Sequence, residues 1–288
     1  MKKVILAISV LLLVAGCSRV ALTGRKQLLL VSDSEVMSLS NSSFKDYMKT
    51  AKQSTNAANK AMVVRVGQRI ANAVETYLRT NGMEDQVRNF AWEFHLVQDN
   101  TPNAFCMPGG KIVVNEGILP YTKTEEGLAI VLGHEVGHAV AKHSAERISQ
   151  QMLASYGGQV LSGVLAGKSA ETRILAQQVY GLGAQYGVML PYSRRNESEA
   201  DHLGLVFAAM AGYNPEAAIA FWQRMSAGGG QKMPQFMSTH PSDEARIRNI
   251  KKLLPEAMRY YKPAQQTARP ATGKMKKGRS FTFERISK

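Results

Sequence analysis

The chain is poor in cysteine, in long apolar runs and in recognisable nucleic-acid-binding patterns. Its two cysteines, Cys17 and Cys106, are too few for a disulfide-stapled scaffold. No apolar run reaches the roughly 20 residues that a membrane-spanning helix needs. Stretches 4–15 and 153–166 are too short, and polar residues or glycine interrupt the second. The net charge of +14 suits nucleic acid, an anionic membrane or acidic partners, but no nucleic-acid-binding motif accompanies it, so we expect no nucleic acid partner.

The first 16 residues have the pattern of a cleaved targeting segment. Lysines at positions 2 and 3 precede an apolar stretch from Val4 to Ala15, as in a signal peptide. The stretch ends in Val14-Ala15-Gly16-Cys17, which resembles the processing site of bacterial lipoproteins, where the cysteine becomes the lipidated first residue. An ordinary cleaved signal peptide and an uncleaved anchor are the alternatives.

A lipidated Cys17 holds the protein on a membrane and leaves the other cysteine alone. More than one acyl chain gives a stable anchor, so we expect a periplasmic, lipid-anchored protein. Ser18 stands where an aspartate would resemble an inner-membrane retention signal, which favours the outer membrane over the inner. Cys106 then remains as a small core residue or a free thiol.

The strongest motif is His134-Glu135-x-x-His138, inside the apolar stretch 128–143. Residues four apart share a helix face, so both histidines can bind one zinc ion, and Glu135 is placed to act as the general base. The stretch predicts a buried helix that starts at Thr122 or at Thr124. Buried histidines are costly without a partner, and one Zn²⁺ per chain is the simplest partner. The alternative is a pair of satisfied core histidines.

A third zinc ligand is expected on a later helix. Glu197 and Asp201 are four residues apart and share a face, whereas Glu199 points elsewhere. We predict that Glu197 binds zinc. Asp201 is predicted to accept a hydrogen bond from the ring nitrogen of a ligand histidine that does not face the metal, and this hydrogen bond fixes the tautomer of the ring. A solvated helix face is the alternative. His143 lies off the ligand face and is predicted to be satisfied or exposed.

Residues 90–117 predict a small sheet beside the zinc helix. Phe90, Trp92 and Phe94 alternate as in a strand, and the glycine-rich connection 108–110 predicts a hairpin. A strand next to a zinc helix can hold an extended peptide by edge addition; plain sheet is the alternative. The residues assigned to substrate binding are Asn103, Ala104, Phe105, Gly109 and Gly110.

The remaining chain predicts mostly helices. Ser32–Glu35 is a polar helix start. An amphipathic helix is predicted over about 57–79, with its end at Asn81-Gly82, and another helix from about Asp243 to Leu254. Residues 148–190 predict one or two helices, with breaks at Gly157-Gly158 and Gly181.

The motif His134-Glu135-x-x-His138 with Glu197-x-x-x-Asp201 resembles the zinc metallopeptidase family of the CAAX prenyl protease, the HtpX/BepA/LoiP-like gluzincins. The resemblance covers about residues 23–253. Further stretches that carry it are Thr23-Gly24-Arg25-Lys26-Gln27, Asn103-Ala104-Phe105, Pro108-Gly109-Gly110, Ser193-Arg194, Thr239-His240-Pro241 and Arg246. The chain lacks the transmembrane helices of some branches and is similar to the soluble periplasmic lipoprotein branch. It has no tetratricopeptide-type repeat after residue 255.

This resemblance implies a mainly α (α+β) fold of the gluzincin type, a zinc-binding helix bundle with a small β-sheet or hairpin bordering the active-site cleft. It also implies that His240 approaches the metal, where it either stabilises the oxyanion in catalysis or occupies the open zinc position and holds the enzyme latent. A loop histidine without a role is the alternative. Arg246 anchors its loop or a substrate carbonyl.

The implied function is a zinc metalloendopeptidase that hydrolyses misfolded or misassembled envelope proteins in protein quality control. Unfolded envelope proteins are then substrates, the membrane is a partner through Cys17, and the outer-membrane assembly machinery is a further candidate partner. The alternative is an envelope chaperone or assembly factor with a latent zinc site.

Four segments follow from these patterns. They are a lipoprotein signal peptide (1–16), a lipidated N-terminus with a lead-in (17–50), the zinc metallopeptidase domain (51–255) and a basic, flexible tail (256–288). Residues 262–288 contain eight lysines and arginines against one acid, Glu284. This composition is typical of a solvated segment that touches anionic lipid or acidic partners.

Overall fold

The computed structural model describes residues 17–164, 166–167, 190–227, 236, 240 and 244–263. The predicted signal peptide, the predicted break at Gly181 and the basic tail from residue 264 lie outside these residues. Within the described part, no helix is long and apolar enough to cross a membrane.

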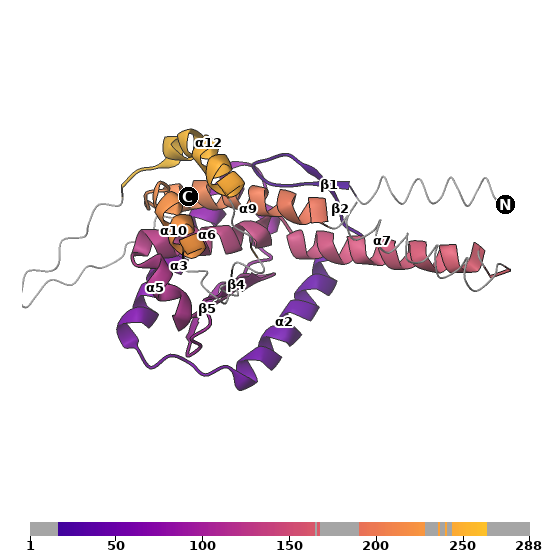
Figure 1. The fold of residues 1–288 in the computed structure, drawn as a ribbon, viewed down its shortest axis with the longest axis horizontal. Coiled ribbons are helices and arrows are strands. Elements are labelled where there is room, and N and C mark those ends of the chain that lie inside the picture. The colour runs from indigo at the N-terminus through magenta and orange to yellow at the C-terminus, as the bar shows by residue number, and fades with distance from the viewer. Residues whose placement is uncertain are drawn as a thin grey trace, which may run out of the picture.

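The described part of the fold is mainly helical, as predicted, and contains the predicted small sheet together with a second, two-stranded sheet that was not predicted. Figure 1 shows α6 and α9 crossing the middle of the body, with α12 above them, α3 and the larger sheet below, and α7 running outward. The described elements are, in chain order, β1 (Cys17–Arg19), β2 (Lys26–Leu28), α2 (Asp33–Thr50), α3 (Ala57–Thr80), α4 (Glu84–Val87), β3 (Glu93–Val97), β4 (Ala104–Met107), β5 (Lys111–Asn115), η1 (Glu116–Ile118), α5 (Leu119–Thr122), α6 (Glu125–Val140), α7 (His143–Val164), α9 (Leu190–Met210), α10 (Ala217–Ala227) and α12 (Glu244–Tyr260).

The larger sheet has the order β3-β5-β4. β4 and β5 pair antiparallel, with Ala104 opposite Val114, which confirms the predicted hairpin. β3 joins β5 in parallel. The alternating aromatics extend beyond this strand, since Phe90 and Trp92 stack on each other, 4.5 Å between centroids, before it begins. β4 therefore forms one edge of the sheet among the described strands, and it lies against α6.

Helix α6 carries the His-Glu-x-x-His motif through the hydrophobic core. The side chain of Thr124 caps the helix by accepting a hydrogen bond from the backbone N–H of Gly127 at 3.1 Å. Thr122 instead ends α5, and Lys123 between them has φ 61°. A start at Thr122 is therefore wrong, because that turn in the backbone separates Thr122 from the helix, and the Thr124 alternative is confirmed.

Helices α6 and α9 approach each other backbone to backbone at a pair of glycines. A Cβ on Gly133 would lie 2.6 Å from the carbonyl oxygen of Gly204, and a Cβ on Gly204 would lie 2.6 Å from the backbone nitrogen of His134. Only glycine permits so close an approach. The contact brings the acidic part of α9 directly against the histidines of α6.

Two predicted helix boundaries are wrong. α7 continues through Gly157 and Gly158, because a glycine inside a helix costs only about 1 kcal/mol and does not stop it without a left-handed cap. α12 continues through Pro255 to Tyr260, so the predicted tail begins inside a helix. Ala257 beyond the proline is buried in the core, and this burial offsets part of the cost of the proline.

Other helix predictions are confirmed. Ser32 caps α2 in a capping box with Glu35. α3 spans the predicted amphipathic stretch and ends before Asn81, and its apolar residues Val63 and Val66 are fully buried.

The segment from residue 18 to residue 30, which we call the N-terminal strap, packs onto the helical body. β1 and β2 pair antiparallel within it, and the backbone N–H of Leu30 donates to Ser149 Oγ on α7 at 2.8 Å. Arg25 in the strap is buried. The strap is therefore tied into the same core as α7 and α9.

Candidate metal centre

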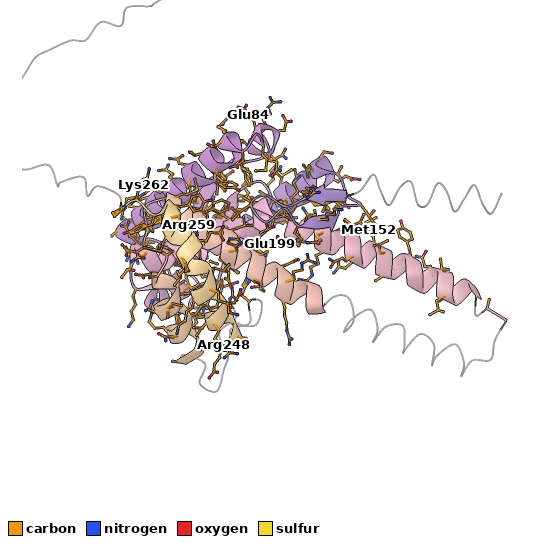
Figure 2. All side chains as sticks on the ribbon, turned by 90° about the horizontal axis from the view of Figure 1, so that it is seen from above. Glu84, Met152, Glu199, Arg248, Arg259 and Lys262 are labelled. Carbon is orange, nitrogen blue, oxygen red and sulfur yellow. The ribbon has the colours of Figure 1, made fainter. Side chains whose placement is uncertain are left out.

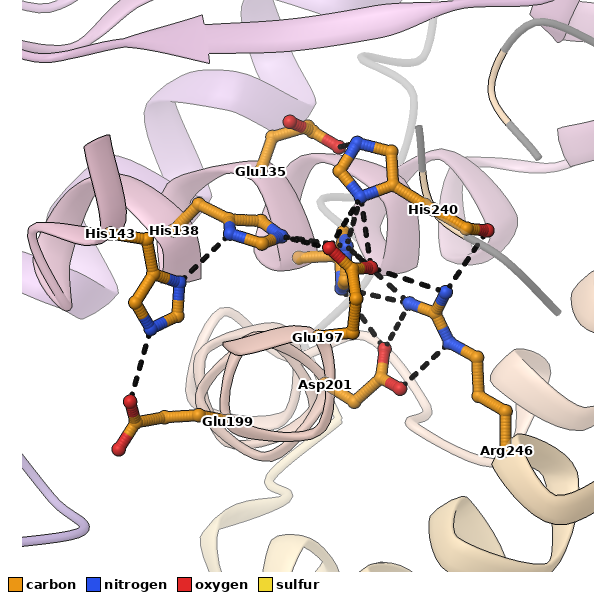
Figure 3. A network of polar contacts seen from close by, with 9 residues as sticks. Glu135, His138, His143, Glu197, Glu199, Asp201, His240 and Arg246 are labelled. Atoms are coloured by element: carbon orange, nitrogen blue, oxygen red, sulfur yellow. Dashed lines mark hydrogen bonds and ion pairs between the residues drawn. The ribbon is translucent and has the colours of Figure 1, made fainter. Parts of the chain in front are cut away.

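Four donor side chains converge between α6, α9 and the segment before α12. His134, His138, Glu197 and His240 each offer one ligand atom, and these atoms lie within 4.8 Å of one another. Figure 3 shows Glu197 on α9 between His138 of α6 and His240. The helical spacing of the motif puts both α6 rings on one face, and the glycine contact described above brings α9 against that face.

The distances between these donors fit a single zinc ion. Nε2 of His134 and Nε2 of His138 are 3.1 Å apart, and each lies 3.3 Å from a carboxylate oxygen of Glu197. Ligands about 2.0–2.1 Å from a tetrahedral zinc are separated by about 3.3 Å. Two imidazoles and one carboxylate are also the donor set of many catalytic zinc sites, so the residues present fit the metal.

Electrostatics favour the ligating form of two of these groups. Burial lowers the pKa of His138 to about 4, so this ring is neutral at physiological pH. Burial alone would raise the pKa of Glu197, but hydrogen bonds from His134, His138 and His240 outweigh it and hold that pKa well below its usual range. The site therefore offers a neutral imidazole and a carboxylate.

Glu135 lies next to the cluster with an unused acceptor. Its side chain is buried, and its Oε1 accepts no hydrogen bond from any described residue. This oxygen lies 3.4 Å from Nε2 of His240. Burial raises the pKa of Glu135, which brings the carboxylate closer to the range in which a general base works at neutral pH.

Asp201 lies behind His134, on the side away from the cluster. Its Oδ1 is 2.9 Å from Nδ1 of His134, so Nε2 of this ring faces the cluster. Arg246 on α12 holds the carboxylate with two hydrogen bonds, from Nε at 2.8 Å and from Nη2 at 2.7 Å. Its guanidinium also stacks over Trp222, 3.6 Å from the ring centroid.

His240 lies inside the cluster. Its Nδ1 is 2.9 Å from Oε2 of Glu197 and 3.1 Å from Nε2 of His134. Nη1 of Arg246 donates to the carbonyl oxygen of His240 at 3.2 Å. Of the two roles predicted for Arg246, this contact corresponds to the anchoring of its loop.

Sequence reasoning missed a second buried chain of contacts behind His138. Nδ1 of His138 lies 2.8 Å from Nδ1 of His143, and Nε2 of His143 lies 3.0 Å from Oε2 of Glu199. Arg25 of the N-terminal strap donates to Glu199 at 2.7 Å and to both carboxylate oxygens of Glu146. Figure 2 places Glu199 within the body, unlike Met152 on the outward part of α7. Both ring nitrogens of His143 thus have hydrogen-bond partners, which agrees with the prediction of a satisfied histidine rather than an exposed one.

The residues assigned to substrate binding lie in and around β4, with different orientations. Ala104 is buried toward the core, while the ring of Phe105 packs against Tyr47 of α2 on the other face of the sheet, 5.3 Å between centroids. The backbone N–H of Asn115 donates to the carbonyl oxygen of Asn103 at 3.0 Å. Gly109 and Gly110 both have positive φ, at 91° and 86°, and form the turn.

A pocket opens beside His138, next to this turn. Apolar side chains from α2, the segment after α4 and the ends of α6 and α7 form much of its wall. Its lining includes Met37, Phe90, Pro108, Gly109, Val140 and Ala145. The ion pair between Asp33 and Lys142, 2.6 Å, also lines it. The pocket can therefore accept an apolar group close to the candidate metal site.

Cys106 is a free thiol on β4. Burial raises its pKa, and the charge of Glu135 raises it further. The thiol therefore stays protonated and unreactive at neutral pH.

Two known protein families match different parts of this chain. The model of peptidase family M48 matches residues 60–254. The model of the prokaryotic membrane lipoprotein lipid attachment site matches residues 1–18.

Curated relatives share the same region. The chain is 42% identical over 190 residues to the mitochondrial metalloendopeptidase OMA1 of Schizosaccharomyces pombe, covering 65% of this chain and 53% of that protein. It is 30% identical over 244 residues to the human mitochondrial metalloendopeptidase OMA1, covering 83% and 46%. It is 31% identical over 161 residues to a beta-barrel assembly-enhancing protease of Yersinia pestis, covering 54% and 35%. The chain spans about half the length of these relatives or less.

Proposed function

Because the chain belongs to peptidase family M48, a family of zinc metallopeptidases, we propose that it is a membrane-anchored zinc endopeptidase that cleaves misfolded or misassembled proteins of the cell envelope. The observation that carries this proposal is the convergence of three imidazoles and a carboxylate beside a buried glutamate with a free acceptor oxygen. One of the imidazoles, His240, is assigned below to a latch and not to the permanent ligand set. A catalytic zinc has three protein ligands and leaves one position open, whereas a structural zinc usually has four.

Each residue of the site then has one role. His134, His138 and Glu197 hold one zinc ion, which when bound supplies Lewis acidity toward the peptide carbonyl and lowers the pKa of water. Glu135 accepts a proton from the attacking water and later returns it to the leaving amine. Asp201 orients the ring of His134 by accepting its Nδ1–H.

The substrate is proposed to be an extended segment of unfolded polypeptide. β4 lies at a sheet edge next to α6, and such an edge binds a peptide through backbone hydrogen bonds that do not depend on sequence. The backbone from Asn103 to Phe105 supplies this edge, and Gly109 and Gly110 keep the adjoining turn free of side chains. The pocket beside His138 takes one apolar side chain of the peptide. A folded protein does not present such a strand.

His240 is proposed to act as a latch. Its Nδ1 occupies a position between Glu197 and His134, where a substrate carbonyl would otherwise approach, and Arg246 fixes its backbone. This arrangement favours the latch over the predicted role at the oxyanion. Movement of His240 then precedes cleavage.

The envelope location rests on the lipid attachment site at residues 1–18 and on the similarity to the Yersinia pestis protease. Acylation of Cys17 is proposed to hold the enzyme in the periplasm on the outer membrane, since Ser18 is no retention signal. The name of that relative, a beta-barrel assembly-enhancing protease, supports the outer-membrane assembly machinery as a partner. Several other relatives are mitochondrial.

Cleavage of unfolded casein by the purified full chain, in detergent with added Zn²⁺, tests the proposal. We expect cleavage by the wild type, zinc binding without cleavage by Glu135→Gln, and faster cleavage by His240→Ala. Retained cleavage by Glu135→Gln would contradict the assigned base, and slower cleavage by His240→Ala would contradict the latch.

The same experiment distinguishes the alternative function. A chaperone with a latent zinc site would suppress casein aggregation and cleave nothing in any variant. Its Glu135→Gln form would also complement a strain that lacks the gene. Both results together would replace the peptidase with an envelope chaperone.

A further inference from the structure

The Nδ1 atoms of the two α6 histidines, which face away from the donor cluster, have different partners. Nδ1 of His134 contacts a carboxylate directly, at Asp201. Nδ1 of His138 contacts a second imidazole, His143, which in turn contacts the carboxylate of Glu199. Each histidine is thus connected to a carboxylate on α9, one directly and one through a ring.

Only one arrangement of protons lets His138 present a lone pair to a metal. If Nε2 of His138 faces the metal, its Nδ1 carries the proton and donates to Nδ1 of His143. His143 must then carry its own proton on Nε2 and donate it to Oε2 of Glu199. The carboxylate, which can only accept, therefore determines the tautomer of both rings.

Glu199 is itself held in place by the N-terminal strap. Nε of Arg25 donates to its Oε2 at 2.7 Å, and Thr23 Oγ1 donates to its Oε1. The other end of the Arg25 guanidinium bonds to Glu146 of α7 at 2.6 and 2.8 Å. The side chains of Arg25, Glu146 and Glu199 are 6%, 2% and 5% exposed, so the geometry is fixed by packing as well as by charge.

A parallel exists on the other side of the site. Asp201, behind His134, is held by the buried Arg246 from α12, just as Glu199 is held by the buried Arg25 from the strap. A buried arginine from each end of the described chain thus fixes the carboxylate that serves one α6 histidine.

We propose that Arg25 is a positioning residue of the metal site, which acts through Glu199 and His143 to fix the tautomer and orientation of His138. The N-terminal strap, which follows the lipid attachment site, is then required for a complete metal centre. This inference rests on the proposed function only in that His138 binds the metal. It does not require that any peptide is cleaved.

The wild-type protein allows a direct test without substitution. Nitrogen NMR of the full chain, labelled with ¹⁵N-histidine and loaded with Zn²⁺, reports which ring nitrogen carries each proton. We expect His138 protonated on Nδ1 and His143 on Nε2. His143 protonated on Nδ1 would overturn the proposal.

Metal affinity provides the second test. The metal-free full chain is titrated with Co²⁺, followed by visible absorption, and with Zn²⁺ in competition with a chelating dye. We expect His143→Phe to weaken Zn²⁺ binding by roughly 10- to 100-fold. Arg25→Lys, which keeps the charge but not the forked geometry, should weaken binding less. His95→Phe, a half-buried histidine on β3 paired with Glu93, is the matched control and should bind normally.

The outcomes separate this inference from the proposed function. If His143→Phe unfolds more easily but binds Zn²⁺ like the wild type, the chain of contacts is only structural and the inference is wrong. If metal binding falls as expected while wild-type protein cleaves no casein, the positioning role holds and the peptidase proposal fails.

Discussion

At the scale of single residues, the site consists of buried charges that contact charges of the opposite sign. Arg246 and Asp201 are 7% and 3% exposed in their side chains, and they form two short hydrogen bonds. A buried pair of this kind contributes little by itself relative to apolar residues, but removing one partner leaves an uncompensated charge. Each carboxylate behind the α6 histidines therefore matters for stability as well as for the metal.

We expect Asp201→Asn to lower the free energy of unfolding of the metal-free protein by roughly 1–3 kcal/mol, because Arg246 then loses two short hydrogen bonds to a carboxylate and keeps the ion pair of its Nη1 with Glu197, 3.3 Å. Urea unfolding without metal measures this loss. Asp85→Asn is the control, since Asp85 pairs with Arg88 on the surface and is 93% exposed; its effect should stay within about 0.5 kcal/mol. Equal stabilities of the two variants would contradict the pairing.

The contacts of the site that the sequence predicts join residues close together along the chain, whereas the contacts that it does not predict join residues far apart. Helical spacing alone puts His134 with His138, and Glu197 with Asp201, on shared faces. The contacts of Arg25 with Glu199 and Glu146 join residues 174 and 121 positions apart. No local period reports such a contact. The resemblance at residues 23–27 was the one signal that could have indicated it.

At the scale of elements, the crossing of α6 and α9 determines whether the ligands meet. Gly133 and Gly204 let the two backbones touch, and Glu197, the proposed metal ligand, lies two helical turns before Gly204 on α9. A side chain at this crossing moves α9 away from α6. The distances of 3.3 Å between Glu197 and the two histidines would then lengthen.

We expect Gly133→Ala to destabilise the protein by roughly 1–3 kcal/mol, as overpacking does, and to weaken Zn²⁺ binding. Gly163→Ala on α7 is the matched control, because a Cβ there meets nothing within 4 Å and alanine favours a helix by up to about 1 kcal/mol. Urea midpoints and Zn²⁺ competition measure both effects. A Gly133→Ala protein as stable as the control would show that the helices can separate without cost.

Two element boundaries could not be predicted from local preference alone. Pro255 predicts the end of a helix, yet α12 continues to Tyr260, and Ala257 beyond the proline belongs to the core. Gly157 and Gly158 predict a break in α7 that does not occur. The existence of the helices followed from their apolar periods, whereas their ends depend on contacts with other elements.

At the scale of the whole molecule, the N-terminus connects the lipid anchor to the core within a few residues. β1 begins at Cys17, and Arg25 is already buried between α7 and α9. With Cys17 acylated as proposed, so short a connection would hold the body of the domain close to the membrane surface.

We expect Cys17→Ser to release the protein from the membrane fraction of a bacterial host with an outer membrane, because without the cysteine no acyl chain can be attached. Cell fractionation and immunoblotting measure this. Cys106→Ser is the control, since its free thiol lies within the fold, and this variant should stay with the membrane. A Cys17→Ser protein that remains in the membrane fraction would show that another part of the chain provides the attachment.

The candidate metal site also joins distant parts of the chain, so a bound metal ion should raise the free energy of unfolding of the whole domain. The donors come from α6, α9 and position 240, and an unfolded chain does not bring them together. A ligand that binds only the native state at 100 times its dissociation constant stabilises it by about 2.7 kcal/mol. For a domain of about 200 residues this corresponds to an increase in Tm of roughly 5–11 °C.

We therefore expect chelation of Zn²⁺ to lower the Tm of the full chain by about this amount, and readdition of Zn²⁺ to restore it. Glu197→Ala should show a much smaller response, because it lacks one of three ligands. Differential scanning calorimetry of both proteins, with and without chelator, measures the difference. An equal response in both would mean that the stabilising ion binds elsewhere, and the assignment of His134, His138 and Glu197 to the metal would be wrong.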